Sequence, residues 1–242
     1  MNNVRTVSDT KRAFYSLHTR PINSIYRRVV EELMVEMHLL SVNVDFQYDP
    51  IYALGVVTTF ERFMQGYRPE ADKDAMFDAL CQAVGYQPQQ YRQDAKRLLE
   101  MASRQWGADI IAGLSQSAAL GDGDLEKHFQ AIASNPKFKY SRLFAVGLYT
   151  LLEQADPDLL KDTKLLNEAI NKIGKGLHLP ADKMQKDLEL YRSNLDKMAQ
   201  ARLLMEDMLK AERKKREQRA ADKGVVVAPP GGQKEPTDAA GS

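Results

Sequence analysis

The chain has 242 residues, 43% of them hydrophobic and 28% charged, with 34 lysines and arginines against 33 aspartates and glutamates. This length allows one substantial domain with a real core, plus an appendage. The formal net charge of +1 provides no global attraction to nucleic acid or to a membrane surface. The single cysteine, Cys81, excludes an intramolecular disulfide framework and indicates a reducing compartment.

The N-terminal residues contain no apolar segment of the kind that a secretory signal peptide needs, so we expect none. The most apolar run, residues 143–152, is far shorter than the ~20 residues that cross a bilayer. We therefore expect no transmembrane segment, and any work at a membrane would be done from its surface.

Helical patterns begin near the N-terminus. Apolar residues at steps of three and four positions predict an amphipathic helix over residues 22–40, with arginines and glutamates on its other face. Asp49 and Pro50 predict the start of the next helix, because aspartate caps a helix and proline suits its first position, and Gly66 predicts its end. The aromatic turn FQYDP is expected to anchor the entry to this helix.

Further apolar faces predict helices over residues 70–85 and 88–106, the second of which includes Trp106. Residues 141–155 are apolar on almost every side, which predicts a central helix buried by several others. No convincing alternation of strand type and no internal repeat at a fixed period is found. Residues 1–178 are therefore predicted to form an all-α, multi-helix bundle.

No proline or glycine interrupts the chain between Pro180 and Gly224. Apolar residues there alternate at steps of four and three, with Arg202 inside the series: Met184, Leu188, Tyr191, Leu195, Met198, Met205 and Leu209. We predict a long, coiled-coil-like C-terminal helix over residues 180–223, of which some should project, since it would reach ~60 Å. Residues 224–242 are rich in proline and glycine and are predicted to be a disordered tail.

Motifs for metal binding are incomplete. The four histidines fall in separate segments, and none has a metal ligand nearby in the sequence: His18, His38, His128 and His178. The acidic stretch at residues 121–129 is similar to the start of a calcium loop, but Lys127 replaces the required glycine and Ala133 the required glutamate. A glycine-containing turn that opens a helix explains this stretch better.

Motifs for catalysis are also incomplete. Residues 173–180 contain a Gly-Lys pair without the rest of a phosphate-binding P-loop, and residues 113–117 lack the second glycine of a nucleophile elbow. Cys81 lies on an apolar face, which favours a buried structural thiol over a nucleophile. We therefore expect a protein that is not an enzyme, with no cofactor and no metal site.

The long helix ends in a basic stretch made of Lys210, Arg213, Lys214, Lys215, Arg216 and Arg219. We favour a solvated helix end, where cations suit the helix dipole. The other interpretation is contact with anionic lipid or an acidic partner. No aromatic residues are interleaved for base stacking, so we expect no binding to nucleic acid.

Two long strings, TVSDTKRAFYSLHTRPINSIYRRVVEELMVEMHLL and YDPIYALGVVTTFERFMQGYRPE, resemble the N-terminal half of the thylakoid formation protein family, also described as a photosystem II biogenesis protein. The similarity covers residues 1–220 approximately and is typical of a cyanobacterial member. The resemblance implies a peripheral protein on the cytoplasmic side of the thylakoid membrane that supports photosystem II biogenesis and repair. The family carries no catalytic residues that could be transferred to this chain.

From this resemblance we expect a non-enzymatic accessory factor that binds and stabilises FtsH-type membrane protease complexes. Photosystem II assembly intermediates and the thylakoid membrane surface are further expected partners. The alternative is a pigment or lipid carrier in photosystem assembly, with an apolar ligand near Phe46, Tyr48 and Tyr52. Candidate contact residues, expected to be exposed, are Arg20, Arg27, Arg28, Tyr48, Tyr52, Arg62, Tyr67, Arg202, Lys210 and Arg213.

Overall fold

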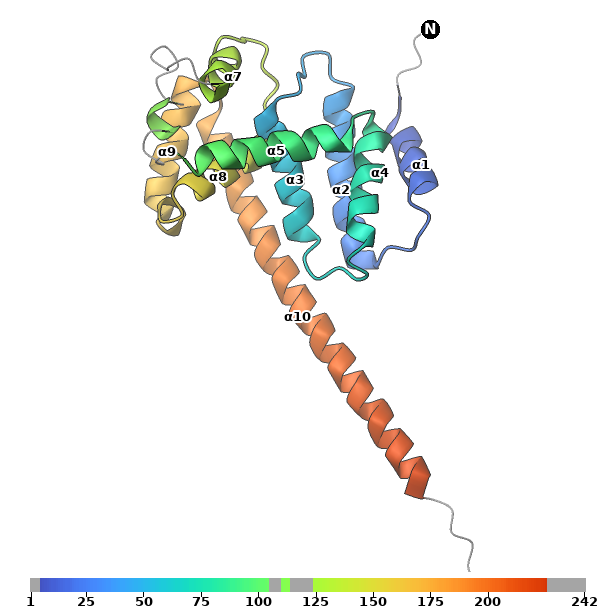
Figure 1. The fold of residues 1–242 in the computed structure, drawn as a ribbon. Coiled ribbons are helices and arrows are strands. Elements are labelled where there is room, and N and C mark those ends of the chain that lie inside the picture. Colours follow the sequence, from blue (N-terminus) through green and yellow to red (C-terminus); the bar gives the residue numbers. More distant parts are fainter. Residues whose placement is uncertain (1–4, 105–109, 114–123, 226–242) are drawn as a thin grey trace, which may run out of the picture. The chain divides into compact units, whose positions relative to one another are not determined.

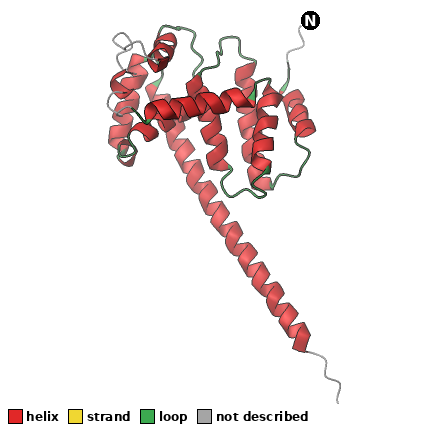
Figure 2. Cartoon of the chain, viewed as in Figure 1, coloured by secondary structure: helices red, strands yellow, loops and turns green. Residues whose placement is uncertain are grey.

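The computed structural model describes residues 5–104, 110–113 and 124–225. Within these ranges every regular element is a helix, which confirms the all-α prediction (Figures 1 and 2). Some residues discussed above lie outside these ranges: Trp106, most of residues 113–117, residues 121–123 and the tail from residue 226. The elements are α1 (Val7–Leu17), α2 (Ser24–Ser41), α3 (Pro50–Phe63), α4 (Asp72–Val84), α5 (Pro88–Ala102), α7 (Asp124–Ala133), α8 (Arg142–Ala155), the 3₁₀ turn η1 (Leu159–Lys161), α9 (Thr163–Gly176) and α10 (Ala181–Val225).

Helix boundaries follow from local capping chemistry. The Asp49 carboxylate accepts a hydrogen bond from the backbone N–H of Tyr52 at 2.9 Å, and Pro50 occupies the first helical position of α3, as predicted. Thr6 and Asp9 form a reciprocal capping box at the start of α1. Gly85 ends α4 with φ of 93°, a left-handed conformation that glycine adopts without strain.

The centre of the bundle is the crossing of α3 and α8. Every residue from Leu143 to Leu152 is buried, which confirms the predicted central helix. At the crossing two glycines bring the helix backbones into direct contact. A Cβ atom on Gly55 would lie 1.7 Å from the carbonyl oxygen of Leu143, and one on Gly147 would lie 1.8 Å from that of Ile51. Neither position has room for any side chain.

α10 is one continuous helix, and this confirms the predicted long C-terminal helix. The chain divides into two compact units, Met1–Met198 and Ala199–Ser242. In the first unit, Met184, Leu188 and Tyr191 of α10 belong to the hydrophobic core. Core packing thus continues beyond residue 178, where the sequence pattern suggests the bundle ends. In the second unit, no residue from 199 to 219 is buried.

Replacing Gly147 with alanine should lower the free energy of unfolding by more than about 3 kcal/mol, because the added methyl group can fit only if α3 and α8 separate. Urea denaturation followed by circular dichroism measures this change. The control Glu189→Ala, at an exposed position of α10, should change it by less than about 0.5 kcal/mol. A Gly147→Ala variant as stable as this control would contradict the backbone contact.

Candidate partner-binding surfaces

An open groove of about 860 Å³ runs along the outer face of α2. α2 forms its floor, α1 contributes Lys11 to one side, and the start of α8 and the first turns of α10 form the other side. The whole groove lies within the first compact unit. Its lining consists of Lys11, Ser24, Arg27, Arg28, Glu31, Glu32, Val35, Glu36, Leu39, Leu40, Tyr140, Ser141, Arg142, Lys183 and Asp187.

Polar contacts fasten both sides of the groove. The Lys11 ammonium lies 2.8 Å from the Glu31 carboxylate, and the Arg142 guanidinium lies 2.6 Å from that of Glu36. Although burial opposes the charged form, Glu36 raises the pKa of Arg142 above its ordinary value. On the same side the Tyr140 hydroxyl donates to Asp187 at 2.7 Å, which joins the segment before α8 to α10. These contacts preform the groove.

The two ends of the groove differ in character. Arg27 and Arg28 are exposed at the N-terminal end of α2, so the structure brings these two predicted contact residues together on one surface. Arg28 pairs with Glu32 at 2.9 Å, and Arg27 has no ion pair within 4 Å among the described residues. At the other end Leu39 is 56% exposed. The groove therefore offers both an apolar contact at Leu39 and an exposed cation, Arg27, outside any ion pair in the described part of the chain.

Two of the predicted contact residues are not on the surface, so the expectation that Tyr52 and Tyr67 are exposed is wrong. Tyr52 is 1% exposed and Tyr67 is 2% exposed. Tyr52 packs against Phe46 and Tyr48, while Tyr67 makes an edge-to-face contact with Tyr26. Because α3 is covered on nearly all sides, Tyr52 has almost no access to solvent.

Three other predicted residues mainly join elements of the bundle. Arg20 pairs with the buried carboxylate of Asp72 at the start of α4. Arg62 pairs with Glu153, which ties the last turn of α3 to the last turn of α8. The half-buried Tyr48 donates from its hydroxyl to Asp94 of α5 at 2.7 Å. Their roles in partner contact stay predictions, and the structure does not gather them with Arg27 and Arg28.

The aromatic turn before α3 is filled by its own side chains. Tyr48 packs on Tyr86 with ring centres 5.9 Å apart and makes an edge-to-face contact with Tyr91 at 5.3 Å. A cavity of about 330 Å³ lies beside this cluster, between the start of α3, α5 and α7. Its volume is at the lower end of the range for pockets that enclose drug-sized ligands.

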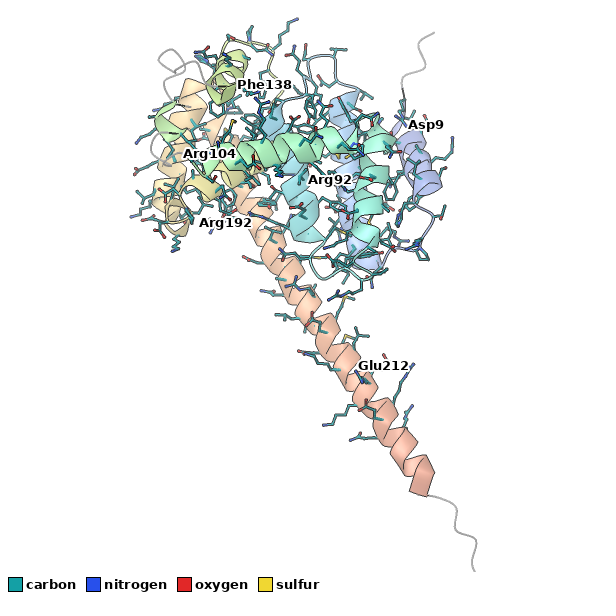
Figure 3. All side chains as sticks on the ribbon, viewed as in Figure 1. Asp9, Arg92, Arg104, Phe138, Arg192 and Glu212 are labelled. Atoms are coloured by element: carbon teal, nitrogen blue, oxygen red, sulfur yellow. The ribbon has the colours of Figure 1, made fainter. Side chains whose placement is uncertain are left out.

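The second unit presents an uncovered apolar surface together with charged groups. Among its side chains Leu203, Leu204, Met208 and Leu209 are each more than half exposed, with 72% for Met208. Leu203, Leu204 and Met208 do not belong to the apolar series with steps of four and three residues that the sequence analysis identifies. The signal that could identify them is the density of apolar residues in the run ARLLMEDML. Arg202, Lys210 and Arg213 lie on the same helix, where Arg213 pairs with Glu217 at 3.0 Å. Figure 3 shows Glu212 among these solvent-facing side chains.

The described residues contain no group of three or more histidine, cysteine, aspartate or glutamate side chains arranged to hold a metal ion. None of the helices in the described ranges combines the length and apolarity needed to cross a membrane. Cys81 is buried as predicted, and burial raises the pKa of its thiol to about 12.

Comparison with known proteins decides the family. The family model described as thylakoid formation protein matches residues 6–220. The chain belongs to the thylakoid formation protein family. It is 67% identical over 231 residues to Protein Thf1 of Trichormus variabilis, covering 95% of this chain and 99% of that protein. Protein Thf1 of Gloeothece citriformis is 60% identical over 220 residues, covering 90% of this chain and 97% of that protein.

A solved structure has the same fold. The structure of Psb29 at 1.55 Å is 47% identical in sequence and superposes with a TM-score of 0.77 over 88% of this chain and 99% of that chain. These relatives of the thylakoid formation family confirm the resemblance seen in the two N-terminal strings. The family model is that of a thylakoid formation protein rather than of an enzyme class.

The ion pair between Glu36 and Arg142 should contribute more than the surface pair between Arg28 and Glu32, because the Glu36 side chain is only 19% exposed. Double-mutant cycles with Glu36→Gln and Arg142→Met should give a coupling energy of about 1 kcal/mol. The matched cycle with Arg28→Met and Glu32→Gln should give about 0.3–0.5 kcal/mol. Urea unfolding of the wild type and the six variants measures both coupling energies, and equal couplings would contradict the fastening role of Glu36.

Proposed function

We propose that this protein is an accessory factor in photosystem II biogenesis and repair that binds and stabilises FtsH-type protease complexes. It would act peripherally on the cytoplasmic side of the thylakoid membrane. The observation that carries the proposal is the match to the thylakoid formation family along residues 6–220. The two surfaces described above, the α2 groove and residues 199–219 of α10, are of the kind that bind macromolecules.

The mechanism would be stabilisation by mass action. A protein that binds an assembled complex, and not its separated subunits, shifts the equilibrium towards assembly by RT ln(1 + [L]/Kd). At a free concentration a hundred times Kd this amounts to about 2.7 kcal/mol. Such an effect needs recognition surfaces and no chemistry, and both candidate surfaces are of that type.

The contributions of the two surfaces can be separated. Exposed cations at a groove, such as Arg27 and Arg28, accelerate encounter with an acidic partner and add affinity when the contact excludes water. Exposed leucines and methionines on one helix, such as Leu204 and Met208, favour docking into an apolar groove of a partner. We assign the polar part of the contact to the α2 groove and the apolar part to residues 199–219.

Affinity capture from mildly solubilised thylakoids tests the proposal. The tagged full-length chain should retain FtsH-type protease subunits, and a chain that ends at Met198 should retain several-fold less because it lacks Leu203 to Leu209. Arg27→Glu/Arg28→Glu should also weaken capture, by about tenfold, through repulsion of an acidic partner. The matched control Lys172→Glu/Lys175→Glu changes the same charge on exposed positions of α9 and should leave capture unchanged.

The truncation point matters for this experiment. A chain ending at Leu179, which the sequence pattern suggests, would lose Met184, Leu188 and Tyr191 from the core and would test folding rather than binding. Capture of photosystem subunits or pigment without protease would overturn the proposal and favour the carrier alternative. Full retention of protease by both the truncated and the charge-reversed chains would contradict the assignment of these surfaces.

A further inference from the structure

α1 is the outermost helix of the group that it forms with α2 and α4 (Figure 1). Its one large anchor is Phe14, which is fully buried. On α4, Asp72 shares a buried stripe with Met76, Ala79 and Ala83, at steps of four, three and four residues. α1 therefore covers surface of α2 and α4 that would otherwise face water.

A buried histidine on α2 holds the first half of α1. His38 is 3% exposed, and its Nδ1 atom lies 2.9 Å from the hydroxyl oxygen of Thr10, which is itself fully buried on α1. Burial lowers the pKa of His38 below its ordinary value. At neutral pH the imidazole beneath α1 is therefore uncharged, and a charged imidazole would lack solvation there.

A second buried histidine holds the end of α1. His18 is the residue that follows its last turn, is 4% exposed, and stacks on Phe14 with ring centres 5.9 Å apart. Its Nε2 atom is buried without a hydrogen-bond partner. A protonated imidazole needs an acceptor for each N–H group, so protonation at this position would bury an unsatisfied donor.

Charged groups around the two imidazoles oppose one another. At His18, Asp72 favours the protonated form and Arg20 disfavours it, and burial outweighs both and lowers the pKa. At His38, Asp9 favours protonation and Arg5 disfavours it, again with burial as the largest effect. Figure 3 shows Asp9 on the outer side of α1. Neither histidine has a neighbouring carboxylate able to compensate for the loss of solvation.

The other contacts between α1 and α2 persist in mild acid. Glu31 accepts from the Lys11 ammonium at 2.8 Å and from the Tyr15 hydroxyl at 2.7 Å. These hydrogen bonds lower the pKa of Glu31, so its carboxylate stays ionised as the pH falls through the range in which histidines titrate. The two histidines are thus the groups of this interface whose charge changes between neutral and mildly acidic pH.

We propose that α1 is an acid-releasable helix, held against α2 and α4 by His18 and His38 in their neutral form and detached when both are protonated, while the rest of the bundle stays folded. This inference is independent of the proposed protease partner, because it concerns the free protein. Acidification would expose the apolar surface beneath α1 without any change in the core around α3 and α8.

The direction and size of the pH effect on α1 attachment follow from proton linkage. When α1 detaches, both imidazoles meet water, where the ordinary pKa is about 6.5. Because their pKa values are lower in the attached state, the detached state binds more protons. Attachment is therefore fully stable above about pH 6.5 and weakens as the pH falls below it. Each histidine can raise the opening constant by up to about tenfold per pH unit, and both together by up to about a hundredfold.

Hydrogen exchange measured by mass spectrometry tests this inference on the full chain at about pH 7.5 and about pH 5.5. After correction for the intrinsic exchange rate at each pH, protection of residues 7–17 should fall by at least tenfold at the lower pH. Protection of residues 143–152 in α8 should stay unchanged. Near-ultraviolet circular dichroism should confirm that the bundle keeps its tertiary structure.

Two matched variants test whether His18 and His38 cause the pH dependence of protection in α1. His18→Asn/His38→Gln removes both titrating groups and should make the protection of residues 7–17 independent of pH. His128→Gln/His178→Asn removes the other two histidines and should retain the full pH dependence. If the first variant does not fold, the wild-type protein still tests the proposal, through the change in protection of residues 7–17 compared with that of residues 143–152. Equal protection of α1 at both pH values, or simultaneous loss in α1 and α8, would overturn the proposal.

Discussion

The contact between the backbones of α3 and α8 at Gly55 and Gly147 is the constraint on which the other elements depend. Two helices that touch without intervening side chains can approach only at one place and one angle, so their relative position is fixed. α5 lies across α3, and Arg62 closes the end of the α3–α8 pair by reaching Glu153. The start of α8 is also where Arg142 meets α2, so the crossing indirectly sets the width of the α2 groove.

Much of the fold could be predicted from the sequence because its signals are local. Asp49 and Pro50 start α3 through a cap and a fixed φ angle, both of which involve neighbouring residues only. The continuous apolar run in α8 predicts burial from all sides without knowledge of its neighbours. The role of Gly55 and Gly147 could not be predicted in this way, since a glycine within a helix usually signals only lower helix propensity.

The candidate surfaces were harder to predict, for a physical reason. Whether a tyrosine on α3 faces water depends on which helices cover that face, and α5 and the aromatic turn bury Tyr52. The α2 groove joins residues of α1, α2, α8 and α10, and no spacing within one segment reveals such a combination. The exposure of Arg27 and Arg28 can be predicted, because an amphipathic helix has one solvent-facing side, which is a local property.

The α3–α8 crossing also has a consequence for biosynthesis. Gly55 leaves the ribosome long before Gly147. The apolar face of α3 that packs on α8 therefore has no α8 to contact while the intervening helices are made. Contacts between residues so distant in sequence lengthen the search that precedes folding. The N-terminal helices of the nascent chain therefore expose core residues such as Ile51 and Leu54 until α8 emerges.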